Sequence, residues 1–232
     1  MKNYILQIDT ATEVCSVAVS QNGQVLAHVE ANEPNIHASK LTIYIEEMMQ
    51  SVGVEFSDLC AIAVSMGPGS YTGLRIGVST AKGLCYALDI PLIGINTLES
   101  IFEGYASQNT LQTSSVYIPM LDARRMEVYM SAFDSKKKII QETQAVIVEK
   151  DTFDVFKPSQ VVLIGSGAAK LKDLFRDSEQ VHLDASYKHS AAYLSGKAFE
   201  RFEQNKFEDL ICFEPYYLKE FIATTNKKPI LG

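Results

Sequence analysis

Short apolar runs and amphipathic stretches alternate along the first hundred residues and predict an ordered series of strands and helices. Residues 4–8 and 14–20 are rich in aliphatic side chains and indicate strands, and Asn22-Gly23 predicts a hairpin turn into a third strand. A helix with one apolar face, ended by Gly53, is predicted by Leu41, Tyr44, Ile45, Met48, Met49 and Val52. The next elements are a strand, a turn, a helix, a strand and a helix, at 61–64, 67–69, 72–88, 91–95 and 98–105. The predicted order is βββαβαβα.

A polar stretch at 107–115 separates this block from a second block with similar signals. Residues 116–121, Asp122 and residues 127–133 repeat the strand, Asp-led loop and strand that surround Asp9. A strand at 161–164 then enters a Gly-Ser-Gly turn and an amphipathic helix predicted at 168–175. A strand followed by a glycine turn and a helix is common in α/β proteins, so this second match is weak evidence that the two blocks are duplicates. The two Asp-led hairpins favour a duplicated lobe.

A duplicated βββαβαβ lobe predicts the α/β class and the ribonuclease-H-like architecture shared by actin, Hsp70 and sugar kinases. In that architecture the Asp-led turns of the two lobes face each other across a cleft. The expected domains are a first lobe at 1–106 and a second lobe at 115–222, followed by a flexible tail at 223–232. The last segment of the second lobe could dock on the first, because residues 215–218 are apolar and are expected to form a last strand or helix end.

Composition limits the function classes. The chain has 232 residues, of which 47% are hydrophobic and 21% are charged, which is enough for one or two cores. No run approaches the ~20 apolar residues of a membrane span, and no signal peptide is evident, so the cytosol is the expected compartment. A net charge of −7 argues against this surface binding a polyanion by itself. The short basic runs, Arg124-Arg125 among them, are interpreted as solvated turns.

Candidate chemistry is sparse. The glycine-rich run at 67–77 follows a strand, but it has no Walker spacing, and Thr72 stands where the third glycine of GxGxxG would be. Asp9 and Asp122 are placed where a metal-phosphate could sit, although an aspartate in a tight turn also bonds its own backbone. The residues predicted to contact a weakly bound nucleotide or anion are Asp9, Thr10, Thr12, Asp122, Gly165 and Gly167. The four histidines form no HExxH motif and no GxSxG elbow is present, so no metal ligand and no catalytic residue is predicted.

One row of small side chains stands out on the helix predicted at 72–88. Its members are four residues apart and therefore share one helix face: Gly73, Gly77, Ala81 and Cys85. A small row lets another helix approach closely. At this point a partner helix and the chain's own sheet explain the row equally well.

Three sequence motifs are long enough to be compared with known families. They are Asp9-Thr10-Ala11-Thr12-Glu13, the run Gly67-Pro-Gly-Ser-Tyr-Thr-Gly-Leu-Arg-Ile-Gly77 continuing to Ala81-Lys82-Gly83, and Leu121-Asp122-Ala123-Arg124-Arg125 with Glu127-Val128-Tyr129. These motifs resemble the TsaB family, also called YeaZ. The resemblance covers roughly residues 4 to 133, with weaker echoes at 165–168 and 215–218. It implies a role in making threonylcarbamoyladenosine beside the anticodon of tRNAs that read codons beginning with A.

In that family the transferring subunit is a paralogue, TsaD, which carries an HxxxH metal-binding helix; here His37 is followed by Leu41 instead. The resemblance implies a non-catalytic scaffold that pairs with a TsaD-like subunit through helices of the first lobe. The interface is then assigned to Gly73, Gly77, Ala81, Leu84 and Cys85.

The same resemblance implies further partners. A TsaE-like ATPase belongs to the larger complex, tRNA is held mainly by the partners, and ATP and metal are expected in those subunits, with no cofactor in this chain. The sequence also leaves it undecided whether the chain forms a homodimer. The alternatives are an actin-like small-molecule kinase or ATPase that uses Asp9, Asp122 and the Gly165 turn, and, least favoured, a metallopeptidase.

Overall fold

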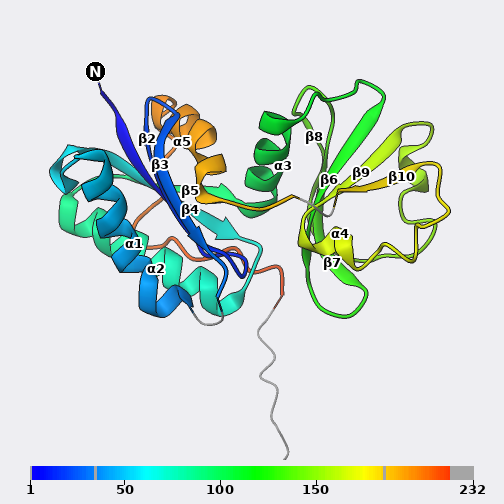
Figure 1. The fold of residues 1–232 in the computed structure, drawn as a ribbon, viewed down its shortest axis with the longest axis horizontal. Helices are drawn as coiled ribbons and strands as arrows, with labels where there is room; N and C mark the ends of the chain where they lie inside the picture. Colours follow the sequence, from blue (N-terminus) through cyan, green and yellow to red (C-terminus); the bar gives the residue numbers. More distant parts are fainter. Residues whose placement is uncertain (1, 34–35, 185–186, 220–232) are drawn as a thin grey trace, which may run out of the picture.

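The structure is a computed structural model that describes residues 2–33, 36–184 and 187–219. Two lobes lie side by side, each built around a five-stranded sheet (Figure 1). No helix in these ranges is long and apolar enough to cross a bilayer. The tail expected at 223–232 lies outside the described residues.

The first lobe follows the predicted order βββαβαβα, which is confirmed. Its elements are β1 Tyr4–Asp9, β2 Cys15–Gln21, β3 Gln24–Ala31, α1 Ile36–Val52, the 3-10 turn η1 Phe56–Asp58, β4 Leu59–Gly67, α2 Tyr71–Leu88, β5 Leu92–Asn96 and α3 Thr97–Gln108. Gly53 follows α1 with a φ of +63°, a left-handed value that suits a glycine at a helix end. The Ser70 hydroxyl caps α2 by accepting from the Gly73 N–H.

The second lobe repeats the strands with shorter helices. Its elements are β6 Ser115–Asp122, β7 Glu127–Phe133, β8 Ile139–Ile147, η2 Asp154–Phe156, β9 Gln160–Ile164, α4 Ser166–Ala169, β10 Val181–Asp184, η3 Ala191–Leu194 and α5 Ser195–Glu203. The helix predicted at 168–175 is wrong, because α4 has only four residues and turns follow it. Ala168, Leu171 and Phe175 are nonetheless buried in the second core. Their helix-like spacing therefore comes from a series of turns that bury the same side chains.

The two sheets have the same topology. Their strand orders are β3-β2-β1-β4-β5 and, read in the same sense, β8-β7-β6-β9-β10. In each lobe the first strand pairs antiparallel with the second and parallel with the fourth. The predicted α/β class with two duplicated lobes is therefore confirmed, and the carboxyl ends of β1 and β6 carry the two Asp-led hairpins.

The last helix of each repeat packs on the sheet of the other repeat. Helix α3 buries Leu98, Ile101 and Phe102 against the second sheet, where the Phe102 ring stacks on Phe133 with centroids 4.3 Å apart. Helix α5 and the preceding η3 turn bury Leu194 and other side chains on the first sheet, on the face opposite α1 and α2 (Figure 1). Because each of these helices packs on the sheet of the other repeat, apolar contacts join the two lobes.

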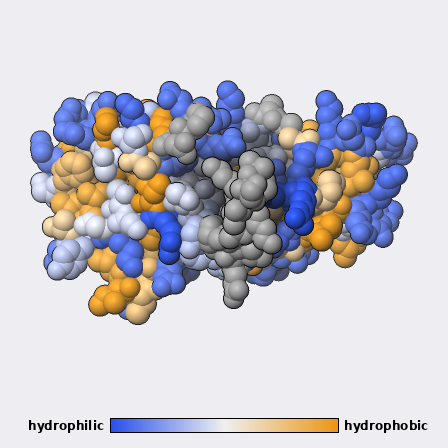
Figure 2. Space-filling model, turned by 90° about the horizontal axis from the view of Figure 1, so that it is seen from below, coloured by the Kyte–Doolittle hydropathy of each residue, from blue (hydrophilic) through white to orange (hydrophobic). Residues whose placement is uncertain are grey.

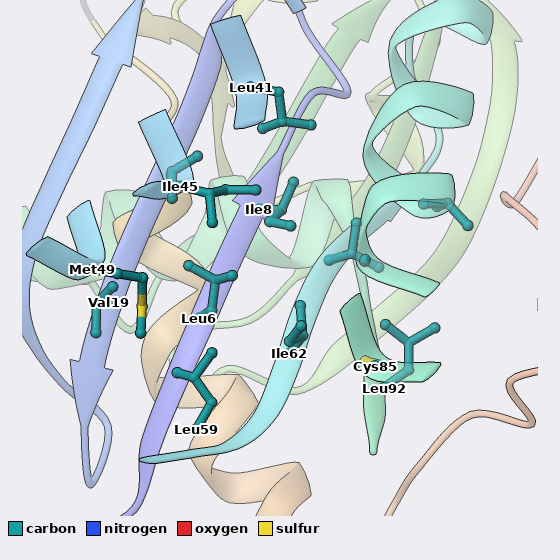
Figure 3. Close-up of a cluster of buried hydrophobic side chains, with 14 of the residues drawn as sticks. Leu6, Ile8, Val19, Leu41, Ile45, Met49, Leu59, Ile62, Cys85 and Leu92 are labelled. Atoms are coloured by element: carbon teal, nitrogen blue, oxygen red, sulfur yellow. The ribbon is translucent and has the colours of Figure 1, made fainter. Parts of the chain in front are cut away.

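The main core of the first lobe lies between its sheet and the helices α1 and α2. Leu41, Ile45 and Met49, spaced by four residues along α1, point toward Leu6 and Ile8 of β1 (Figure 3). All five side chains are at most 3% exposed. This packing explains why the apolar face of α1 could be read from the sequence.

Residues 206–219 return along the first lobe as a C-terminal strap. The Glu208 N–H donates to Leu92 O over 2.9 Å, extending the edge at β5, and Lys82 Nζ donates to the carbonyl of Phe213 over 2.8 Å. Near the end of the strap, the Tyr216 N–H donates to Met66 O over 2.7 Å. The strand or helix end predicted at 215–218 is wrong, because the docked segment is neither.

Candidate functional site

A cavity of about 1230 Å³ opens between the two lobes. Both Asp-led hairpins line it, together with the start of α2 and the last described residues of the C-terminal strap. The tyrosines Tyr71 and Tyr217 face it from these two elements, with ring centroids 5.0 Å apart. The sequence therefore predicted the place of this cleft and the docking of residues 215–218 on the first lobe, but not that this segment lines the cleft.

The hairpin of the first lobe holds its aspartate away from the cavity. Asp9 is 1% exposed; its Oδ1 accepts from the Ala11 N–H over 3.0 Å, and its Oδ2 lies 2.6 Å from His189 Nε2. Burial alone would raise the pKa of Asp9. The ion pair and hydrogen bond with His189, with help from Ala11 and the Ser65 hydroxyl, hold the pKa below its ordinary value instead. Asp9 is therefore an ionised, internally satisfied group.

The hairpin of the second lobe repeats this arrangement near the surface. Asp122 Oδ1 accepts from the Arg124 N–H over 2.7 Å, as Asp9 does from Ala11, and it also accepts from Lys170 Nζ over 2.6 Å. Desolvation opposes ionisation, but the hydrogen bonds from Lys170 and the Arg124 backbone keep the pKa of Asp122 below its ordinary value. Each of the two aspartates is thus bonded to a basic side chain of the same protein, Asp9 to the His189 imidazole and Asp122 to the Lys170 ammonium.

The six predicted nucleotide or anion contacts fall into two groups. Thr12, Asp122 and Gly165 line the cavity. Asp9, Thr10 and Gly167 are behind it, because Thr10 is fully buried with its hydroxyl donating to Gly73 O over 2.7 Å, and a Cβ on Gly167 would lie 2.8 Å from Met120 Cβ. Among the described residues, no three His, Cys, Asp or Glu side chains are grouped so that they could hold a metal ion.

Reasoning from the sequence missed His189 and Lys170. His189 lies 180 positions from Asp9 along the chain, and Lys170 lies 48 positions from Asp122. Neither residue belongs to a motif, so no local signal could have found these partners. Sequence reasoning also gave Arg124 and Arg125 no function, although both line the cavity.

The small row of α2 faces inward. A Cβ on Gly73 would lie 2.0 Å from Thr10 O, and a Cβ on Gly77 would lie 2.2 Å from Thr10 Oγ1. Ala81 and Cys85 are at most 1% exposed, and Leu84 packs against the same core. The assignment of the partner interface to Gly73, Gly77, Ala81 and Cys85 is therefore wrong, because these residues pack on the chain's own fold. Leu84 is half-buried, and its place in the interface stays a prediction.

Helix α2 has a second face that is exposed. This outer face consists of Thr72, Arg75, Ser79, Gly83 and Tyr86. Tyr86 is 83% exposed, and a Cβ on Gly83 would meet nothing within 4 Å. On the neighbouring α1, Ile43 is 41% exposed. Figure 2 shows, from below, hydrophobic residues on the surface of the lobe that carries these two helices.

Comparisons with known proteins agree with this geometry. The family model described as TsaD, tRNA N6-adenosine threonylcarbamoyltransferase, matches residues 24–228. The tRNA threonylcarbamoyladenosine biosynthesis protein TsaB of Escherichia coli (strain K12) is 32% identical over 225 residues, which are 94% of this chain and 96% of that protein. The protein of the same name from Bacillus subtilis (strain 168) is 27% identical over 177 residues, 75% of each chain.

Among solved structures, YeaZ from Pseudomonas aeruginosa superposes with a TM-score of 0.78 at 26% identity, covering 93% of this chain and all of that one. The similarity therefore spans both lobes and extends beyond the residues 4 to 133 that carry the motifs.

Proposed function

Because this chain belongs to the TsaD-related TsaB (YeaZ) family, we propose that it is a scaffold subunit needed to form threonylcarbamoyladenosine on tRNA. It acts by binding a TsaD-like catalytic subunit, and the modified adenosine is the one beside the anticodon. A TsaE-like ATPase joins the larger complex. The net charge of −7 supports tRNA being held mainly by the partners.

The observation that carries the non-catalytic role is the pairing of both cleft aspartates. A kinase of this architecture needs carboxylate oxygens that face the cleft and hold a magnesium nucleotide. Here Asp9 is buried against His189, and Asp122 is bonded to Lys170. Ligating a metal through Asp9 would require breaking its buried pair and leaving His189 unsatisfied, and a metal at Asp122 would have to compete with the Lys170 ammonium. The chain is therefore proposed to hold no cofactor and to catalyse no step by itself.

The outer face of α2, with the adjoining surface of α1, is the proposed partner surface. A helix from another subunit can approach closely over Ser79 and Gly83, since their side chains are small. Tyr86 is the large side chain at the end of this face, and exposed tyrosines are enriched among residues that dominate binding energy. A second copy of this chain would use the same face, so a homodimer and the heteromeric complex compete.

Reconstitution tests the non-catalytic role. Threonylcarbamoyladenosine formation is measured on tRNA with a TsaD-like subunit, a TsaE-like ATPase and the synthase that makes threonylcarbamoyl adenylate. We expect product only when this chain is added, and Asp122→Ala should support the same rate because Asp122 lies on the surface of a hairpin. ATP turnover by the isolated chain that Asp122→Ala abolishes would establish a catalytic role instead.

A further inference from the structure

Two adjacent arginines adopt a backbone conformation that arginine rarely takes. Arg124 and Arg125, at the tip of the β6–β7 hairpin, have φ values of +71° and +52°. Asparagine and glycine occupy this left-handed region at little cost, and they are the usual residues at such positions in hairpin turns. Residues held in unfavourable backbone regions cluster at functional sites.

The two arginines place positive charge at the interlobe cavity. Both side chains are exposed and line the cavity, and neither guanidinium has an ion pair or hydrogen bond within the described part of the chain. The carboxylates of the same hairpin do not neutralise the two arginines, because Asp122 pairs with Lys170 over 2.6 Å and Glu127 pairs with Lys219. The hairpin therefore presents two unneutralised cations to the cavity.

The charges around the cavity suit an anion without a metal ion. A magnesium nucleotide would need carboxylate ligands, but Asp9 is buried against His189. Two further carboxylates line the cavity, Glu13 and Glu30; they have no ion pair among the described residues and belong to the first lobe. An anionic ligand would therefore place its charged end against the arginine hairpin of the second lobe and its uncharged end toward the first.

We propose that the interlobe cavity binds a small phosphate compound through Arg124 and Arg125 without a divalent metal ion. Each planar guanidinium can bind phosphate oxygens through two parallel N–H donors, which lysine cannot do. Tyr71 and Tyr217 line the same cavity and offer ring surface for an apolar or aromatic part of the ligand. The shared chemistry is a phosphate group, and its source is either a nucleotide or a free inorganic phosphate compound.

Calorimetric titration of the full chain with ADP and with inorganic pyrophosphate, each in EDTA and in magnesium, tests the proposal. Binding in EDTA that magnesium does not strengthen is expected. Tighter binding of ADP than of pyrophosphate identifies a nucleotide as the source, and equal binding identifies the phosphate group alone.

The variant that tests the residues is Arg124→Asn with Arg125→Gly. It removes both charges and introduces residues that fit the left-handed backbone, so affinity should fall by about tenfold or more while the melting temperature rises. The matched control is Lys136→Ala with Lys138→Ala, which removes the same charge from exposed positions in the β7–β8 turn and should bind like wild type. The single variant Arg125→Gly gives a second measurement with less change to the turn.

Three results would overturn the proposal. They are no binding of either probe, binding that requires magnesium, and unchanged affinity in the folded arginine variants. All are measured on the isolated chain, so they are independent of whether a TsaD-like subunit binds.

Discussion

Two glycines on helix α2 lie in opposite surroundings. A Cβ on Gly77 would lie 2.2 Å from Thr10 Oγ1, whereas a Cβ on Gly83 would meet nothing within 4 Å. Gly77→Ala should therefore lower the free energy of unfolding by about 1–3 kcal/mol through overpacking. Gly83→Ala should raise it by up to about 1 kcal/mol, because alanine favours the helix. Urea denaturation of both variants measures this difference, and equal effects would contradict the inward packing of the small row.

Asp9 should make the fold sensitive to acid. Its pKa is lowered in the folded protein, so the stability it contributes is present above the ordinary carboxyl pKa of about 4 and is lost as the pH falls through the lowered value. Asp9→Asn should be less stable than wild type at neutral pH and should lose less stability on acidification. Denaturation at several pH values tests this, with the exposed Asp173→Asn as the control. Parallel pH profiles for Asp9→Asn and wild type would argue against the buried pair.

Most elements of the first lobe could be predicted because each has one clear hydrophobic pattern. The apolar face of α1 matches the core that it meets, and the strands are continuous apolar runs. Helix α2 was harder, since both its small row and its face with Leu74 and Val78 are buried. Spacing shows which residues share a face, but not that Thr10 of the hairpin covers the small row.

A lysine of α2 donates hydrogen bonds to the C-terminal strap. Lys82 Nζ donates to the carbonyls of Ile211 and Phe213 over 3.3 and 2.8 Å. Lys82→Met keeps most of the side-chain stem but removes the donors, so amide hydrogen exchange in residues 209–214 should speed up while α1 and the central strands keep their protection. Hydrogen exchange followed by mass spectrometry measures this. Unchanged exchange in the strap would show that Phe213 and Tyr216 hold it without the lysine.

At the scale of the whole molecule, the two lobes should unfold together, because α3 and α5 each pack on the sheet of the other repeat. Phe102 of α3 is buried on the second sheet and Leu194 beside α5 is buried on the first. Phe102→Ala and Leu194→Ala should each destabilise by about 2–5 kcal/mol and shift one common calorimetric transition. Two transitions, with each variant moving only one, would show that the lobes are thermodynamically independent.

The candidate site shows where sequence reasoning reaches its limit. The duplicated hairpins could be recognised because each lobe repeats its own local signal, and the structure places them at one cleft. The partners of Asp9 and Asp122 could not, because His189 and Lys170 come from distant segments without a motif. A resemblance to a scaffold family predicts that a partner exists, but only burial shows which face of α2 is free to meet it.

A binding titration with a TsaD-like subunit from the same organism tests the scaffold role most directly. Gly83→Arg places a long charged side chain on the outer face of α2, in open space. Gly196→Arg is the matched control, because Gly196 is an exposed helical glycine with open space on α5, which packs on the opposite face of the first sheet. Wild type and Gly196→Arg should form the complex with equal affinity, and Gly83→Arg should lose about tenfold or more without a lower melting temperature. Binding of folded Gly83→Arg as tightly as wild type, or no binding by wild type, would contradict the account.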